Sequence, residues 1–249
     1  MTATGSAYDR GMPLDKTSPF RDAYAAVAAA AVAVVLWLVL RAGGPLKPEA
    51  LFGWLCLFLI LMTVVTIAQT AFAATERSAF RGFLFLSVTS LLLIGACALA
   101  GGHLGMREIV CVAAIFVTWQ CLWAVATRWL CRLGSAAANA IALTVAALLM
   151  ASPVVCIPLV RAAGVSGQGR LVELIRDTCP LLALVDAVRP SMKIDWSHLP
   201  GMYEWSGLGQ DIPMMLPNAW VSVRIYAIVS CVLVAGTFLF GKVPRAAKA

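Results

Sequence analysis

Hydroxyl and amide side chains form a stripe within one long apolar stretch of the chain. Thr63, Thr66 and Thr70 recur at the spacing of one helix face, and Gln69 lies beside them. Gln120 is a further amide in a different apolar stretch. Because polar groups in apolar surroundings need partners, two interpretations stay open. The stripe lines a substrate path, or it consists of hydroxyls that bond to their own backbone at helix contacts, which is the more common arrangement.

The residues that catalytic or metal centres require are scarce in this sequence. It holds two histidines, His103 and His198, and it has no GxxxxGK[ST] loop, no GxGxxG loop and no GxSxG elbow. The eight cysteines form no CxxC pair and are typical of small buried residues. No acidic residue falls in the middle of an apolar stretch, which disfavours a proton-coupled carrier. We therefore predict a protein that is not an enzyme, has no catalytic residues and holds no metal or cofactor of its own.

The composition indicates that most of the chain lies in lipid. The 249 residues are 61% hydrophobic and 12% charged, whereas soluble domains are roughly 45–50% apolar and about 25% charged. The net charge of +7 comes from Lys and Arg residues scattered between apolar stretches, so they indicate membrane topology and no nucleic-acid partner. The expected fold class is an all-α integral membrane protein in contact with a lipid bilayer.

Six apolar stretches predict six transmembrane helices. A bilayer core about 30 Å thick takes about 20 apolar residues per crossing. The polar N-terminal tail covers residues 1–23, the first five helices lie within 24–160, the sixth covers 219–241, and a basic tail covers 242–249. The expected helices run over 24–40, 49–74, 82–100, 106–126, 140–160 and 219–240. Pro153 and Pro158 predict a kink or early unwinding at the end of the fifth.

Residues 161–218 predict a folded segment outside the bilayer, because they hold half of the twelve acidic residues. Apolar residues among charges over 168–189 predict two short amphipathic helices on the outer rim of the bundle, with a break near Cys179. Beyond them, residues 196–205 contribute to an irregular, aromatic-rich cap that begins at Trp196 and includes Trp205.

The second short helix is expected to begin at Pro180, whose missing N–H costs nothing in a first helical turn. One face of it is expected to rest on the bundle, and this face is formed by Leu181, Leu184, Val185 and Val188. Asp186 and Arg189 are three residues apart on the opposite side, where they are expected to form an ion pair.

Lys and Arg residues near the span ends predict the orientation in the membrane, because positive residues resist translocation. With the termini inside, the short outer turns hold only Arg41, Lys47 and Arg107. The tails and short loops of the inner side then hold Arg10, Lys16, Arg21, Arg77, Arg81, Arg128, Arg132, Lys242, Arg245 and Lys248. We therefore expect both termini in the cytoplasm, residues 161–218 outside, and a bacterial-type cytoplasmic (inner) membrane.

Three short stretches carry a resemblance to a known family. AATER at 73–77 is similar to an acidic-basic turn after a second helix, SAAANA at 135–140 to a small-residue start of a fifth helix, and CPLLALVDAVR at 179–189 to an outer motif. Together with six crossings and both termini inside, these stretches resemble the permease subunits of ATP-driven exporters of the ABC-type-two family.

This resemblance implies a membrane-spanning permease with several partners. Thr75, Glu76, Arg77 and Arg81 would form a turn that docks a separate cytoplasmic ATPase, which would hold the ATP and Mg. A second permease subunit, identical or different, would complete the exporter, and the helix from Pro180 to Arg189 would be its outer gate.

The substrate class and an alternative function follow from the same residues. The spans offer hydroxyls, amides and apolar surface without a buried charge, which suits an amphipathic, lipid-like or peptide substrate better than an inorganic ion. The alternative is a non-catalytic accessory or scaffold subunit of a larger membrane complex. In that case the helix from Pro180 would be a static lid, and the cap at 196–205 would dock a partner.

Overall fold

The computed structural model describes residues 48–73, 75–101, 104–162, 164–192 and 218–240, which form helices and no strand. Within these residues, four helices are long and apolar enough to cross a membrane. They are α2 (Pro48–Phe72), α3 (Glu76–Gly101), α4 (Met106–Leu130) and α11 (Ala219–Phe240). The all-helical architecture is thereby confirmed. The expected first helix (24–40), both tails and the cap at 196–205 lie outside the described residues.

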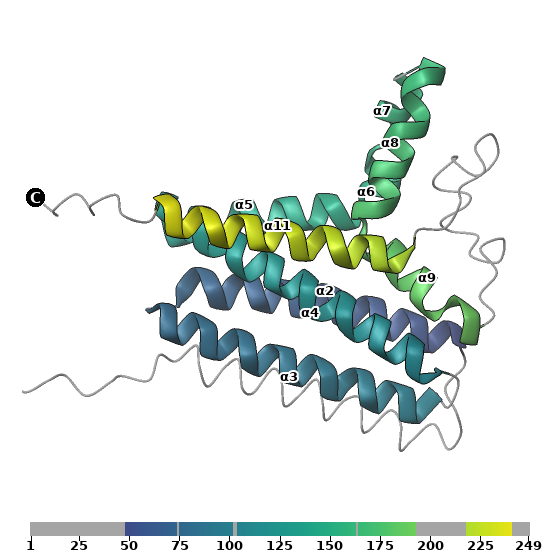
Figure 1. Cartoon of the computed structure of the whole chain (residues 1–249), viewed down its shortest axis with the longest axis horizontal. Helices are drawn as coiled ribbons and strands as arrows, with labels where there is room; N and C mark the ends of the chain where they lie inside the picture. Colours follow the sequence, from purple (N-terminus) through teal and green to yellow (C-terminus); the bar gives the residue numbers. More distant parts are fainter. Residues whose placement is uncertain (1–47, 74, 102–103, 163, 193–217, 241–249) are drawn as a thin grey trace, which may run out of the picture.

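The long helices lie side by side along the long axis of the molecule (Figure 1). The α4 helix is central, since it packs against α2, α3, α11 and the shorter α5 (Ser135–Met150). Its fully buried side chains Phe116 and Trp119 are among the largest in the core. The outer faces are apolar as well, with Leu92, Ile228 and Val232 each more than 60% exposed. Helices that are apolar all round are typical of a bundle whose outer surface meets lipid.

The α3 helix begins six residues earlier than the expected start at Gly82. Thr75 caps it, because its Oγ1 accepts a hydrogen bond of 3.1 Å from the Ser78 N–H and its carbonyl accepts one of 3.0 Å from the Ala79 N–H. The charged residues 76–81 were expected to form a turn between two helices, and this expectation is wrong. They are the first turns of α3.

The fifth apolar stretch does not form the single helix expected over 140–160. The α5 helix starts directly after Gly134, whose φ of 102° suits glycine, and it ends at Met150. Its 16 residues span about 24 Å, less than a bilayer core of about 30 Å. Two short helices follow, α6 (Ser152–Val155) and α7 (Ile157–Ala162).

The prolines explain where this stretch breaks, as the sequence predicted. Pro153 has no N–H to donate to the carbonyl of Leu149, so continuing α5 would leave that carbonyl without its helical partner. The Ser152 Oγ donates to the Leu149 carbonyl instead, over 2.7 Å. The next break, at Cys156, lies just before Pro158 in the same way. The predicted kink is therefore confirmed.

The α8 helix (Gly164–Thr178) packs against α7 through a small apolar cluster of Val160, Val172 and Ile175. Figure 1 shows α6, α7 and α8 standing away from the bundle, across its long axis. The side chains of Leu159 and Leu174 on this projecting unit are about 60% exposed, at 61% and 59%. The expected amphipathic helix before Cys179 is therefore present.

The α9 helix (Pro180–Met192) begins at the expected proline, and the break at Cys179 separates it from α8. It packs against α4, α11 and α2 rather than resting on an outer rim with one face. The expectation of a one-sided rim helix is wrong for α9. The buried residues surround most of its circumference: Leu182, Ala183, Leu184, Val185, Ala187 and Val188.

Candidate functional site

The residues expected to dock an ATPase lie where α3 begins. Glu76, Arg77 and Arg81 are exposed on its first turns, and Thr75 is its exposed cap. The Nη2 of Arg128, near the end of α4, lies 3.9 Å from the Oε1 of Glu76. Because the Glu76 side chain is 89% exposed, this ion pair contributes little to stability. It does place the start of α3 and the end of α4 on one surface.

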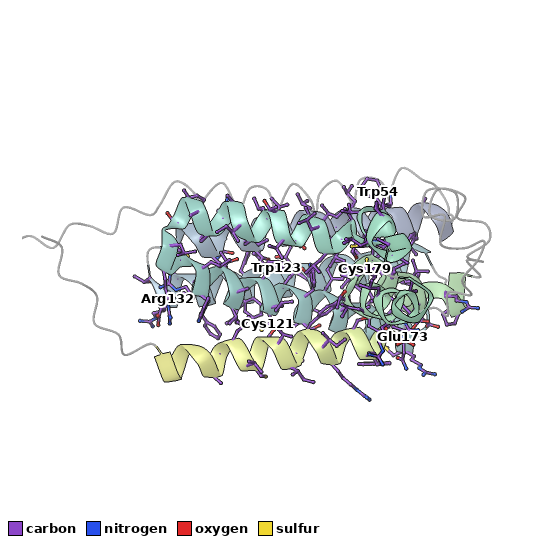
Figure 2. All side chains as sticks on the ribbon, turned by 90° about the horizontal axis from the view of Figure 1, so that it is seen from above. Trp54, Cys121, Trp123, Arg132, Glu173 and Cys179 are labelled. Carbon is purple, nitrogen blue, oxygen red and sulfur yellow. The ribbon has the colours of Figure 1, made fainter. Side chains whose placement is uncertain are left out.

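The end of α4 extends this surface. Arg132 lies in a single 3-10 turn, η1 (Cys131–Leu133), and its guanidinium carbon lies 5.3 Å from the centre of the Trp129 ring. Figure 2 shows Arg132 at one end of the bundle and Glu173 toward the other. An exposed Trp beside an Arg at a helix end is typical of the headgroup region of a membrane. We call this surface the charged end; its residues are Thr75, Glu76, Arg77, Arg81, Arg128 and Arg132.

The threonine stripe of α2 is buried inside the bundle. The Thr63 Oγ1 donates to the carbonyl of Leu59 over 2.6 Å, and the Thr66 Oγ1 donates to the carbonyl of Met62 over 2.7 Å. Thr70 is buried on the same face. Hydroxyls that bond four residues back are satisfied within their own helix. These bonds favour the interpretation of the stripe as a feature of helix contacts.

Side chains of α2 contact both neighbouring helices. The indole Nε1 of Trp119 on α4 donates to the Thr63 Oγ1 over 2.9 Å, which links the cores of the two helices. The half-buried Gln69 amide fills the space that a Cβ at residue 82 would occupy. Gly82 therefore leaves room for the Gln69 side chain between α2 and α3.

The amide of Gln120 joins α4 to α3 but is only half satisfied. Its Nε2 donates to the Ser90 Oγ over 2.6 Å, and the Ser90 Oγ donates to the Leu86 carbonyl over 2.9 Å. Its Oε1 is buried without a partner among the described residues. The same holds, within the described ranges, for Ser87 Oγ, Trp123 Nε1, Thr127 Oγ1, Asn139 Oδ1 and Ser222 Oγ. Three of these six residues, Gln120, Trp123 and Thr127, share one face of α4.

The α9 helix, which was expected to be an outer gate or a static lid, is packed on most sides. Of its expected buried face, Leu184, Val185 and Val188 are fully buried and Leu181 is half-buried. Pro180 is buried as well. The helix therefore closes one end of the bundle between α2, α4 and α11.

Asp186 does not form the expected ion pair with Arg189. Among the residues that the structure describes, the ion pairs join Glu76 to Arg128 and Arg176 to Asp177. Asp186 is half-buried, and its Oδ2 accepts a hydrogen bond of 2.9 Å from the N–H of Ala219, the first residue of α11. The free N–H groups and the dipole at a helix start attract a carboxylate more strongly than an exposed Arg does. Arg189 stays exposed.

Two further contacts hold the joint between α8 and α9. The Tyr226 hydroxyl of α11 donates to the Thr178 carbonyl over 3.0 Å, and the Cys179 thiol donates to the Met150 carbonyl over 3.6 Å. The Tyr226 ring meets the Trp119 ring edge to face, with centroids 5.0 Å apart. Burial raises the pKa of the Cys179 thiol, which therefore stays neutral.

Five buried residues were not predicted from the sequence as site residues: Ser87, Ser90, Trp119, Trp123 and Thr127. A helical period counted from Gln120 would have found Trp123 and Thr127, whereas no pattern pairs Gln120 with Ser90 on another helix. Within the described ranges, no group of three or more His, Cys, Asp and Glu residues is placed to hold a metal ion. Comparison with family models, with curated proteins and with solved structures finds no match to this chain.

Proposed function

We propose that this chain is the permease subunit of an ATP-driven exporter of the ABC-type-two kind. The observation that supports it best is the charged end, an exposed basic surface built directly on two candidate spans, α3 and α4. The sequence has no phosphate-binding loop of its own, so ATP and Mg belong to a separate cytoplasmic subunit. An amphipathic, lipid-like or peptide substrate fits the uncharged spans, and a second permease subunit completes the exporter.

The helical start of α3 supports a simple mechanical coupling. Residues 76–81 are the first residues of one uninterrupted 26-residue helix. Closure of a docked ATPase against Glu76, Arg77 and Arg81 would therefore tilt the whole of α3 against α4. Rigid-body motion of packed helices is a common way to expose alternate sides of a bundle.

The proposed topology keeps six crossings with both termini in the cytoplasm of a bacterial-type inner membrane. The candidate spans α2, α3, α4 and α11 are four of them. The apolar sequence at 24–40 is proposed as the fifth, and the short α5 as the sixth, which would cross where the bilayer thins locally. The charged end then faces the cytoplasm, in agreement with its arginines. The α8 and α9 helices lie toward the outer side.

The experiment that tests this function compares Glu76→Ala/Arg77→Ala with Arg107→Ala. Arg107 is also exposed but lies at the opposite end of α4 from the charged end. The tagged chain is purified from its own host membrane, and any bound ATPase is identified by its phosphate-binding loop and by ATP hydrolysis. We expect the double variant to lose the ATPase and transport at unchanged thermal stability, and Arg107→Ala to keep both. Wild-type protein without an ATPase, or a double variant with normal transport, would refute the proposal.

A second candidate function, an accessory subunit of a larger membrane complex, is favoured by the projecting α6–α8 unit. Val154, Val155, Leu159 and Leu174 are exposed on it and offer an apolar surface to a neighbouring protein. Crosslinking α9 to the N-terminal end of α2 through introduced cysteines separates the two functions. The crosslink blocks transport if α9 is a gate, and it leaves an accessory subunit unaffected.

A further inference from the structure

Four buried polar groups without a hydrogen-bond partner among the described residues lie on the neighbouring helices α3 and α4. The chain order makes these helices antiparallel, because a short connection joins the end of α3 at Gly101 to the start of α4 at Met106. Two contacts fix their register: Gln120 bonds to Ser90 near the middle, and Arg128 meets Glu76 at the charged end. Along the two helices, the positions of Ser87, Trp123 and Thr127 fall between these contacts, and each of these residues, like Gln120, carries a buried polar atom without a partner among the described residues.

These groups share faces that meet. Gln120, Trp123 and Thr127 follow the i, i+3, i+7 spacing of one α4 face, and Ser87 lies one turn from Ser90 on α3. Gln120 and Thr127 are separated by about 10 Å along the helix axis. Figure 2 shows Trp123 near the middle of the bundle. We call Ser87, Gln120, Trp123 and Thr127 the polar seam.

The seam differs chemically from the threonine stripe on α2. Thr63 and Thr66 are satisfied by carbonyls of their own helix. The seam atoms, although more than nine-tenths buried, have no partner in the part of the chain that the structure describes. An unsatisfied buried donor or acceptor costs free energy, and most of all where lipid rather than water surrounds the bundle. Burial in the closed seam is therefore energetically unfavourable for these polar groups.

One end of the seam, Thr127, lies in the last turn of α4, next to the charged end. Thr127 precedes Arg128, whose side chain is 31% exposed at the charged end. At the other end is Gln120, and the residue before it, the fully buried Trp119, is bonded through its indole to Thr63 on α2. A path from the charged end along this face of α4 would therefore run from Thr127 to Gln120.

We propose that the polar seam is the closed form of a cavity that opens from the charged end and binds water and the uncharged hydroxyl or amide groups of a substrate. The seam offers one acceptor at Gln120 Oε1, one donor at Trp123 Nε1, and two hydroxyls that do both. It holds no charge, so ions are excluded. The substrate part of this inference rests on the proposed exporter function, in which tilting of α3 against α4 opens the seam. The water part does not depend on it.

The test is cysteine accessibility in the full chain, reconstituted in nanodiscs, with the native cysteines replaced by Ala or Ser. Thr127→Cys and Ser87→Cys report on the seam. Thr66→Cys is the matched buried control from the satisfied stripe, and Arg132→Cys is the exposed control. The probe is a small, water-soluble methanethiosulfonate reagent. We expect both seam cysteines to react at least about tenfold faster than Thr66→Cys and more slowly than Arg132→Cys.

A second variant keeps the proposal falsifiable if a cysteine variant does not fold. Thr127→Val has nearly the same shape and removes only the hydroxyl. If the seam opens to water, Val at this position lowers the reaction rate of Ser87→Cys several-fold. Seam cysteines that react no faster than Thr66→Cys, or a rate at Ser87→Cys that ignores Thr127→Val, would overturn the inference.

The outcomes separate this inference from the proposed function. Labelling requires no ATPase and no transport. A reactive seam in a chain that binds no ATPase would refute the exporter and keep the water-filled cavity. An inert seam in a chain that binds and drives an ATPase would refute the cavity and keep the exporter.

Discussion

Replacing Asp186 with Ala should weaken the attachment of α9 to α11. The Asp186 Oδ2 accepts the N–H of Ala219 over 2.9 Å, while the Asn218 side chain accepts the N–H of Trp220 over 3.1 Å. The two side chains thus satisfy two of the free N–H groups at the start of α11. Since they bond different groups, Asn218 does not replace the lost carboxylate.

The expected loss follows from the two effects that the carboxylate combines. Removing a helix cap costs about 1 kcal/mol, and a charge near a helix N-terminus contributes about 0.3–1 kcal/mol. Because Asp186 is half-buried, the two effects together amount to about 1–2 kcal/mol. For a chain of this size we expect the melting temperature to fall by about 2–8 °C. Asp186→Asn keeps an acceptor without the charge and should fall between wild type and Asp186→Ala.

The assay is thermal unfolding in one detergent or nanodisc preparation, with Arg189→Ala and the Asp186→Ala/Arg189→Ala double variant as controls. The structure leaves Arg189 exposed, so its removal should change stability by less than about 0.5 kcal/mol and add independently to the Asp186 effect. The reasoning would be refuted if Arg189→Ala cost as much as Asp186→Ala and the double variant cost no more. That result would mean that the two side chains pair with each other.

Two further changes test the helix contacts. Ala142→Leu should destabilise the bundle by about 1–3 kcal/mol in the same unfolding assay, because Ala142 is fully buried where α5 meets the core. The control Ala140→Leu, on the exposed side of α5, should have little effect. Equal effects would contradict the observed faces. Burial raises the pKa of the Cys179 thiol. N-ethylmaleimide should therefore leave Cys179 unmodified in the folded protein from about pH 7 to about pH 9 and modify it after unfolding in detergent. Peptide mass spectrometry measures the modified fraction. Above the ordinary thiol pKa of about 8.5, the unfolded chain releases the thiol proton of Cys179 and the folded chain keeps it, so the free energy of unfolding falls as the pH rises. Modification of Cys179 that increases with pH in the folded protein would contradict the raised pKa.

The features that sequence reasoning found correctly depend on residues close together in the chain. The α11 helix covers the expected 219–240, and α4 begins at the expected Met106. Pro180 starts α9 and Pro153 follows the end of α5, because a missing N–H acts within one turn of its own helix. The cap at Thr75 is also local, but the charges at 76–81 were interpreted as a break between two helices, and so the start of α3 was predicted too late.

Apolar stretch length and proline position by themselves therefore determined the class of this protein and most helix limits, since lipid requires backbone groups to be satisfied within each segment. The partners of polar side chains were decided only by the tertiary structure. Gln120 bonds to Ser90, 30 residues away, and Asp186 bonds to Ala219, 33 residues away, although Arg189 was nearer in sequence. Such partners depend on how closely the helices approach and in which register, and both follow from the shapes of all the buried side chains together rather than from the spacing within any one helix.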